Sequence, residues 1–135
     1  MRMTEPEKSA RDQPAARERN SRDWDIQELL QRLDNDQGFL CELLRIFRED
    51  SQANLQKAKS ALAEGNFLGL MRAAHTMKGM LRNLSMNRAA ETAFALETTS
   101  RQGKGNEAGA LLSQLEQAVA ELLPKVEAQL AEVKT

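Results

Sequence analysis

The feature that most constrains the fold is a helical repeat of apolar residues that returns in four long segments of the chain. Within each segment, apolar residues recur every three or four positions, which places them on one side of an α-helix. The segments span about 37–64, 67–84, 87–101 and 107–133. Aromatic residues make up only 4% of the 135 residues, which disfavours a sheet. The sequence therefore predicts an all-α protein.

The short breaks between these segments predict how the helices connect. Asp36 can cap the first long helix, and Gly65 followed by Asn66 ends that helix and starts the next. Ser85 or Asn87 is the expected cap of the third long helix. Connections this short make successive helices antiparallel neighbours. We therefore expect an antiparallel up-down four-helix bundle.

Three further expectations concern the two ends of the chain. Trp24 and Ile26 open a short extra N-terminal helix, which is expected to form a lid at one end of the bundle. Pro124 lies inside the last segment, where it removes a backbone hydrogen bond, so we expect a kink or a break into two helices. Residues 1–22 contain almost no large apolar side chain and are expected to form a disordered tail or linker, which leaves the bundle in residues 23–135.

Composition excludes several classes of function. The formal net charge is −1, which gives no field that would attract nucleic acid. One histidine and one cysteine are too few for a zinc or non-haem iron site, and Cys41 falls in an apolar stripe where a buried, inert thiol is expected. There is no glycine-rich phosphate loop, and no apolar stretch is long enough for a membrane span or a secretion signal. We expect a cytoplasmic monomer without a cofactor.

The single histidine, His75, is the residue that points to a function. On a helical wheel it lies roughly 140° from the centre of the apolar stripe of its helix, so its imidazole is expected to face solvent. Lys78 follows three residues later. Gly79 stands at i+4, where a good helix former would be more stable by about 1 kcal/mol. The missing side chain at Gly79 leaves room for a partner to reach the imidazole.

Other residues on this side of the helix are expected to form a surface for a partner. Arg72 and Arg82 flank His75 with positive charge, and exposed apolar residues around a reactive centre suggest docking. The expected partner-binding residues are Leu68, Met71, Arg72, Arg82 and Met86. No carboxylate that could orient the imidazole is evident on this face, which disfavours a Ser/His/Asp or Cys/His nucleophile.

A neutral imidazole is nucleophilic near pH 7 and can hold a phosphoryl group through a labile N–P bond. The transferring group is highly anionic, so most of the catalysis consists of positioning and charge stabilisation. The cations near His75 suit this chemistry.

Residues 25 to about 101 resemble a histidine-containing phosphotransfer (Hpt) domain, the four-helix module of two-component phosphorelays. The resemblance rests on Ala74-His75-Thr76-Met77-Lys78-Gly79, which is similar to the Ala-His-x-x-Lys-Gly signature of that family. Supporting features are Asn35-Asp36 ahead of a long helix with Phe47 and Asp50, Gly65-Asn66 ten residues before the histidine, and Leu96-Glu97 on the following helix. Two positions depart from the family pattern: Ser85 stands where a glycine is usual, and Met80 where a small residue is usual.

The resemblance implies that His75 is the phosphoacceptor, that Lys78 assists with charge and that Gly79 gives access. The implied partners are receiver domains of response regulators or hybrid histidine kinases, which exchange the phosphoryl group through an aspartyl phosphate. The Mg²⁺ of the reaction would belong to the receiver. Nothing in the chain resembles the ATP-binding domain of a kinase, so the resemblance implies a mediator of phosphotransfer and not an enzyme that uses ATP.

Two alternatives stay open at this point. A helical adaptor would bind a receiver or a kinase without carrying phosphate, and the presence of both His75 and Lys78 disfavours it. A structural bundle would use Leu68, Met71 and Met86 as a subunit interface, and His75 would then be buried.

Overall fold

The computed structural model describes residues 24–133, which form five helices and, within that range, no strand. The tail expected at 1–22 lies outside the described residues. The helices are α3 (Ile26–Arg32), α4 (Gln37–Ala63), α5 (Phe67–Asn83), α6 (Asn87–Arg101) and α7 (Gly105–Val133). The prediction of an all-α fold is confirmed, and the apolar repeat located each long helix to within about two residues.

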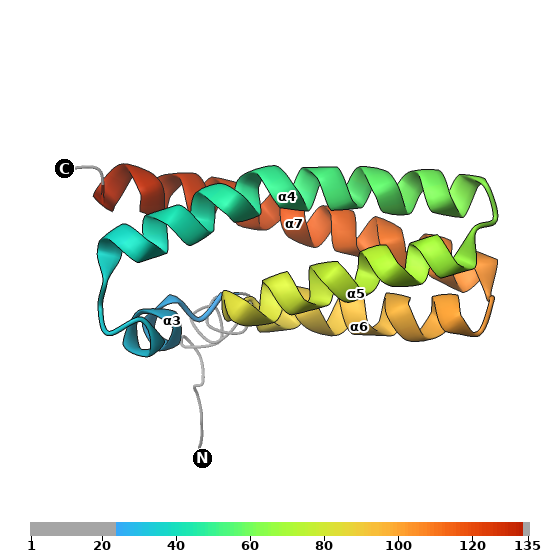
Figure 1. The fold of residues 1–135 in the computed structure, drawn as a ribbon, viewed down its shortest axis with the longest axis horizontal. Helices are drawn as coiled ribbons and strands as arrows, with labels where there is room; N and C mark the ends of the chain where they lie inside the picture. The colour runs from blue at the N-terminus through green and yellow to red at the C-terminus, as the bar shows by residue number, and fades with distance from the viewer. Residues whose placement is uncertain (1–23, 134–135) are drawn as a thin grey trace, which may run out of the picture.

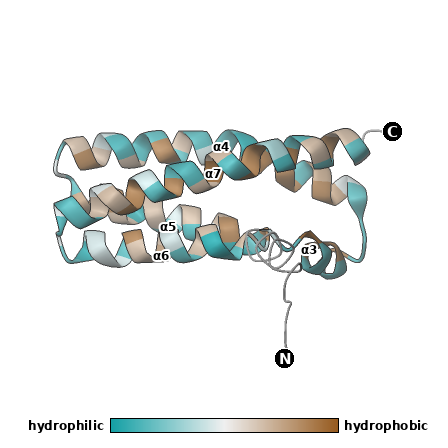
Figure 2. Ribbon diagram, turned by 180° about the vertical axis from the view of Figure 1, so that it is seen from behind, coloured by the Kyte–Doolittle hydropathy of each residue, from teal (hydrophilic) through white to brown (hydrophobic). Residues whose placement is uncertain are grey.

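The four long helices lie side by side along the long axis of the molecule (Figure 1). Helix α4 packs against α5 and α7, and α6 packs against the same two helices, so the four form a closed ring around one core. Hydrophobic and hydrophilic residues alternate along each helix in Figure 2, as a helix with one buried side requires. The fully buried side chains include Leu40, Leu44, Phe47, Leu70, Met77, Leu81, Leu96, Leu115, Val119 and Val126.

Short polar side chains start three of the helices. The carboxylates of Asp25 and Asp36 accept hydrogen bonds from backbone N–H groups in the first turns of α3 and α4, and the Asn66 side chain does the same for α5. Gly65 has a left-handed backbone with φ of 70°, which lets α4 end and α5 begin within two residues. The predictions for Asp36, Gly65 and Asn66 are confirmed.

The turn between α5 and α6 differs from the prediction. The N-cap position of α6 is Met86, whose side chain makes no capping hydrogen bond, so the prediction that Ser85 or Asn87 caps this helix is wrong. Ser85 is fully buried and has a left-handed backbone with φ of 58°, a conformation that glycine adopts most easily. Ser85 therefore keeps a left-handed turn at the position where the resemblance led us to expect a glycine.

The hydroxyl of Ser85 fastens α3 to this turn. It donates a hydrogen bond to Glu28 Oε1 at 2.8 Å and accepts one from Arg32 Nη2 at 2.6 Å. Trp24 Nε1 donates to the carbonyl oxygen of Leu84 at 2.9 Å. Helix α3 is thereby held at one end of the bundle, which is the place predicted for it (Figure 1).

Helix α7 runs through Pro124 without ending, so the prediction of a break into two helices is wrong. Pro124 and Ala120 are both exposed, so the carbonyl that loses its partner is free to bind water. Val119, Leu122 and Val126 are buried on either side of the proline, and their packing holds the helix together through this turn.

Candidate functional site

His75 lies midway along α5 with 66% of its side chain exposed, while Ala74 and Met77 beside it are buried in the core. The predicted orientation of the imidazole toward solvent is confirmed. The ring therefore stands at the surface of a rigid helix, with its backbone fixed by the buried residues on the opposite side.

A carboxylate from the neighbouring helix binds the inner nitrogen of the ring. Glu97 of α6 is only 6% exposed at its side chain, and its Oε2 lies 2.8 Å from His75 Nδ1. The expectation that no carboxylate orients His75 is wrong. The helical wheel of α5 could not reveal this contact, because Glu97 lies 22 residues further along the chain.

Two cations also bind the Glu97 carboxylate. The ammonium of Lys78 donates to Oε1 at 2.7 Å, and only 14% of the Lys78 side chain is exposed. Arg101, one turn later on α6, reaches Oε2 at 3.4 Å and is mostly exposed. The buried carboxylate is therefore surrounded by His75, Lys78 and Arg101, as a buried charge requires.

The pKa of Glu97 follows from these contacts. Burial raises the pKa of the carboxyl, but the hydrogen bonds from Lys78 and His75, with the charges of both groups, outweigh burial, so its pKa is below the ordinary value. Glu97 is therefore a carboxylate near neutral pH, and a carboxylate only accepts hydrogen bonds. His75 Nδ1 must then carry the proton of this hydrogen bond, which leaves the lone pair of a neutral ring on Nε2.

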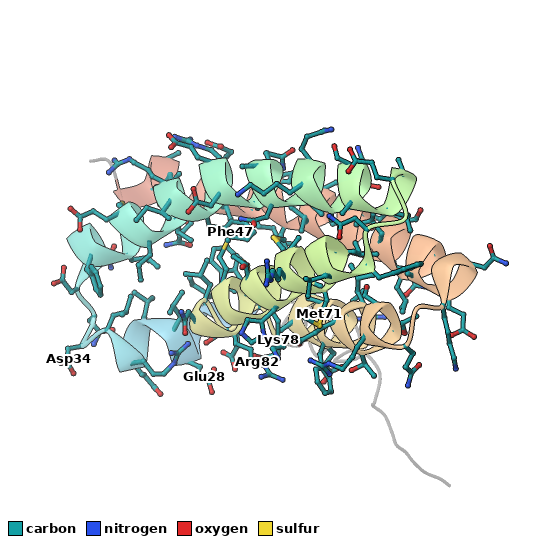
Figure 3. The ribbon with its side chains drawn as sticks, turned by 45° about the vertical axis from the view of Figure 1, so that its right-hand side comes forward. Glu28, Asp34, Phe47, Met71, Lys78 and Arg82 are labelled. Carbon is teal, nitrogen blue, oxygen red and sulfur yellow. The ribbon has the colours of Figure 1, made fainter. Side chains whose placement is uncertain are left out.

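Phe94 forms a platform for two cations on the α6 side of the site. Its ring centroid lies 5.1 Å from the ammonium of Lys78 and 5.8 Å from the guanidinium of Arg82. Figure 3 shows Met71, Lys78 and Arg82 along the edge of α5 that faces α6. Phe94 itself is 48% exposed, because it lies roughly 100° from the centre of the buried stripe of α6.

Two glycines of α5 have different reasons to lack a side chain. A Cβ at Gly69 would lie 2.6 Å from the Asn66 side chain that caps the helix, so this glycine serves the fold. A Cβ at Gly79 would meet nothing within 4 Å. No contact within the described protein requires glycine at position 79, although glycine costs the helix about 1 kcal/mol.

The five residues expected to bind a partner differ in their exposure to solvent. Leu68 is 54% exposed, Met71 is partly buried, and Arg72 and Arg82 are exposed. The expectation that Met86 projects on this surface is wrong, because its side chain is fully buried. Met86 lies in the turn before α6, where its backbone direction carries the side chain into the core.

Sequence reasoning missed the role of Glu97, although the sequence contains a signal for it. Ala93, Leu96 and Ser100 share its buried stripe on α6, so Glu97 places a carboxylate where an apolar residue is expected. A buried carboxylate requires cationic partners, and Lys78 and Arg101 supply them. No such signal identifies Arg101, which lies on an exposed face.

Residues 24–133 contain no group of three or more His, Cys, Asp or Glu side chains placed to hold a metal ion. In the same range, every helix is too short or too polar to span a lipid bilayer.

Comparison with known families adds an independent finding. The family model described as the Hpt domain matches residues 42–125, which is more than half of the chain and extends from α4 into α7. Comparisons with curated proteins and with solved structures give no match for this chain. The family match includes every residue of the His75 site. The chain therefore belongs to the Hpt family, whose domains mediate phosphotransfer and interact with receiver domains in two-component phosphorelays.

Proposed function

We propose that this chain is a phosphorelay intermediate that takes a phosphoryl group from the aspartyl phosphate of one receiver domain and passes it to another. The phosphoryl group is carried on Nε2 of His75. The observation that supports this most directly is an exposed imidazole whose Nδ1 is bound by a buried carboxylate.

Glu97 prepares the nucleophile. Because Nδ1–H donates to the carboxylate, the free lone pair stays on Nε2, and the ring cannot turn without breaking the bond. Nε2 attacks the phosphorus atom, an N–P bond forms, and the P–O bond to the receiver aspartate breaks. The electron pair of that bond leaves with the aspartate as a carboxylate. The positive charge that appears on the ring is balanced by Glu97, and the Nδ1 proton stays in its hydrogen bond.

Lys78 acts mainly through Glu97 in this proposal. Its ammonium is held between the carboxylate and the Phe94 ring and is largely buried, so it compensates the charge of Glu97 in the resting state. Arg72 and Arg82 are exposed cations on the same helix as His75 and are placed to attract an anionic phosphoryl group.

The donor and acceptor are receiver domains, and the Mg²⁺ of the reaction is bound by them. The direction of phosphoryl transfer is set by the partners, because the same step runs in reverse when a receiver aspartate attacks phosphohistidine. We propose that the chain acts in the cytoplasm. We also propose that it is a monomer, because a receiver must be able to reach His75 from solvent.

The test is incubation of the purified chain with a panel of receiver domains that have been phosphorylated with acetyl phosphate. We expect acid-labile, base-stable label on the wild-type chain and none on His75→Gln. That variant should keep the thermal stability of the wild type, because the ring is mostly exposed. Label on His75→Gln, or no label on the wild type with any receiver, would favour an adaptor that carries no phosphate.

Gly79 gives a second test of the same proposal. A Cβ at this exposed position would meet nothing within 4 Å, and leucine favours a helix over glycine, so Gly79→Leu should fold normally and be at least as stable as the wild type. It should slow transfer from a receiver by about 10-fold or more, because the new side chain occupies the approach to His75. An unchanged rate would contradict the role of Gly79 in access.

A further inference from the structure

Phe94 lies at the surface of α6 although its side chain is apolar. About half of it is exposed, so packing in the core does not account for a phenylalanine at this position. Two cations of α5 lie over its ring, with the ammonium of Lys78 at 5.1 Å and the guanidinium of Arg82 at 5.8 Å from the centroid. Both distances fall within the range of cation–π attraction. The ring therefore belongs to the polar surroundings of His75.

The position of Phe94 on α6 brings its ring to Lys78. Phe94 precedes Glu97 by three residues, which puts the two side chains on neighbouring turns of the same edge of the helix. The Lys78 ammonium contacts both groups, since it lies 2.7 Å from Glu97 Oε1 and over the Phe94 ring. Only 14% of the Lys78 side chain is exposed, and a cation–π contact is stronger where water is excluded. Lys78 is thus held from two sides.

The support for Lys78 matters because of what its ammonium does at Glu97. Lysine has a long, flexible side chain with a strongly hydrated ammonium, so without contacts it extends toward water. Burial raises the pKa of Glu97, and the hydrogen bond from Lys78 is the strongest of the contacts that lower it. Loss of that bond favours a protonated carboxyl, which no longer requires the proton of the imidazole to be on Nδ1.

We propose that Phe94 is a positioning residue for phosphotransfer, because its ring holds the ammonium of Lys78 on Oε1 of Glu97. The other carboxylate oxygen, Oε2, is then left to accept the hydrogen bond from Nδ1 of His75. Phe94 does not touch the phosphoryl group in this arrangement and acts only through Lys78 and Glu97. This inference rests on the proposed function, because it concerns the nucleophile of the same site.

The test uses phosphoramidate, a small donor that phosphorylates histidine without a partner protein. Phe94→Leu keeps an apolar side chain but has no aromatic face, so His75 should be phosphorylated about 3–10-fold more slowly than in the wild type. Phe94→Tyr keeps the ring and should restore the wild-type rate. Phe39→Leu, which changes a similarly exposed phenylalanine of α4, is the matched control and should react at the wild-type rate.

Two double variants show whether the effect of Phe94 passes through Lys78. Lys78→Met removes the ammonium and keeps the length of the side chain, so Phe94→Leu should cause no further loss of rate in that background. In an Arg82→Gln background, Phe94→Leu should cause the same loss as in the wild type, because the proposal assigns the effect to Lys78. A further loss with Lys78→Met, or no loss with Arg82→Gln, would overturn the proposal.

The position of the imidazole proton gives a readout that a merely structural role of Phe94 would not change. NMR of the ring nitrogens should show the proton of the neutral wild-type ring on Nδ1, and a larger fraction on Nε2 in Phe94→Leu. Urea unfolding should give nearly the wild-type free energy for both Phe94 variants, because the side chain is half-exposed. A wild-type rate and proton position in Phe94→Leu, or a slow Phe94→Tyr, would contradict a role of the aromatic ring.

The same measurements separate this inference from the function on which it rests. If phosphoramidate labels His75 and a phosphorylated receiver transfers to it, the proposed function holds whatever the Phe94 variants do. If phosphoramidate gives no label that His75→Gln removes, the proposed function fails, and the role of Phe94 in phosphotransfer fails with it.

Discussion

Two polar clusters interrupt the apolar interior of this bundle, and they use similar chemistry for different ends. In the first, Glu97 binds His75 and Lys78 between α5 and α6. In the second, Ser85 binds Glu28 and Arg32 where α3 meets the α5–α6 turn. Both centre on a polar side chain that is nearly or fully buried.

The difference lies in which groups stay open to solvent. The Ser85 cluster uses the hydroxyl both as donor and as acceptor, so its bonds are complete within the chain. The Glu97 cluster holds one edge of an imidazole that is 66% exposed and leaves the other edge free. A buried polar group therefore marks a reactive site when one of its partners still faces solvent with an unused atom.

The largest expected effect follows from removal of the Glu97 charge. Glu97→Gln keeps the size of the side chain but no longer fixes the proton on Nδ1, so phosphotransfer to His75 should slow by roughly 10–100-fold. The rate of His75 phosphorylation by phosphoramidate, a small phosphate donor, measures this effect without a partner protein. Glu91→Gln, on the exposed face of the same helix, is the matched control and should transfer at the wild-type rate. A wild-type rate in Glu97→Gln would show that the Glu97 cluster, like the Ser85 cluster, does not serve reactivity.

Disruption of the Ser85 cluster should affect stability instead. Ser85→Ala removes both hydrogen bonds and keeps a Cβ in the left-handed conformation, so the free energy of unfolding should fall by about 1–3 kcal/mol. Ser85→Gly should lose less, by about 1 kcal/mol, since glycine adopts this conformation without strain. Urea unfolding measures both values. If either variant transfers phosphate more slowly from phosphoramidate, the second cluster is coupled to the site.

Ser51 extends the comparison to a buried hydroxyl without a partner. It is fully buried in α4, and its Oγ makes no hydrogen bond within residues 24–133. Ser51→Ala should therefore raise the free energy of unfolding by about 1 kcal/mol, because the cost of the unsatisfied hydroxyl is removed and alanine favours the helix. Thermal unfolding tests this, and a lower midpoint would show that the hydroxyl has a stabilising partner.

The smallest expected effect concerns acid pH. The pKa of Glu97 is lower in the folded protein than its ordinary value of 4.5, so its ionisation stabilises the fold above that pH. This contribution is lost as the pH falls through the folded pKa. The difference in unfolding free energy between the wild type and Glu97→Gln should therefore shrink from about pH 6 to about pH 3. A difference that grows on acidification would contradict a carboxylate stabilised by cations.

Much of the fold could be predicted because it follows from local rules. A repeat of three and four residues fixes which side of each helix is buried, and it placed Met77 inside and His75 outside. Asp36, Gly65 and Asn66 set helix boundaries through contacts within a few residues. The same rules failed at Ser85, whose hydroxyl is bound by residues of α3 more than fifty positions earlier.

The amino-acid sequence alone was enough to predict an all-α bundle with one histidine on a solvent-facing side and a glycine one turn away. Two further features depend on how the helices pack against one another: Glu97 of α6 binds that histidine, and Met86 turns into the core. The physical reason is that helical periodicity acts within one segment. The register between α4, α5 and α6 depends on how their side chains pack, and that register sets which charges meet.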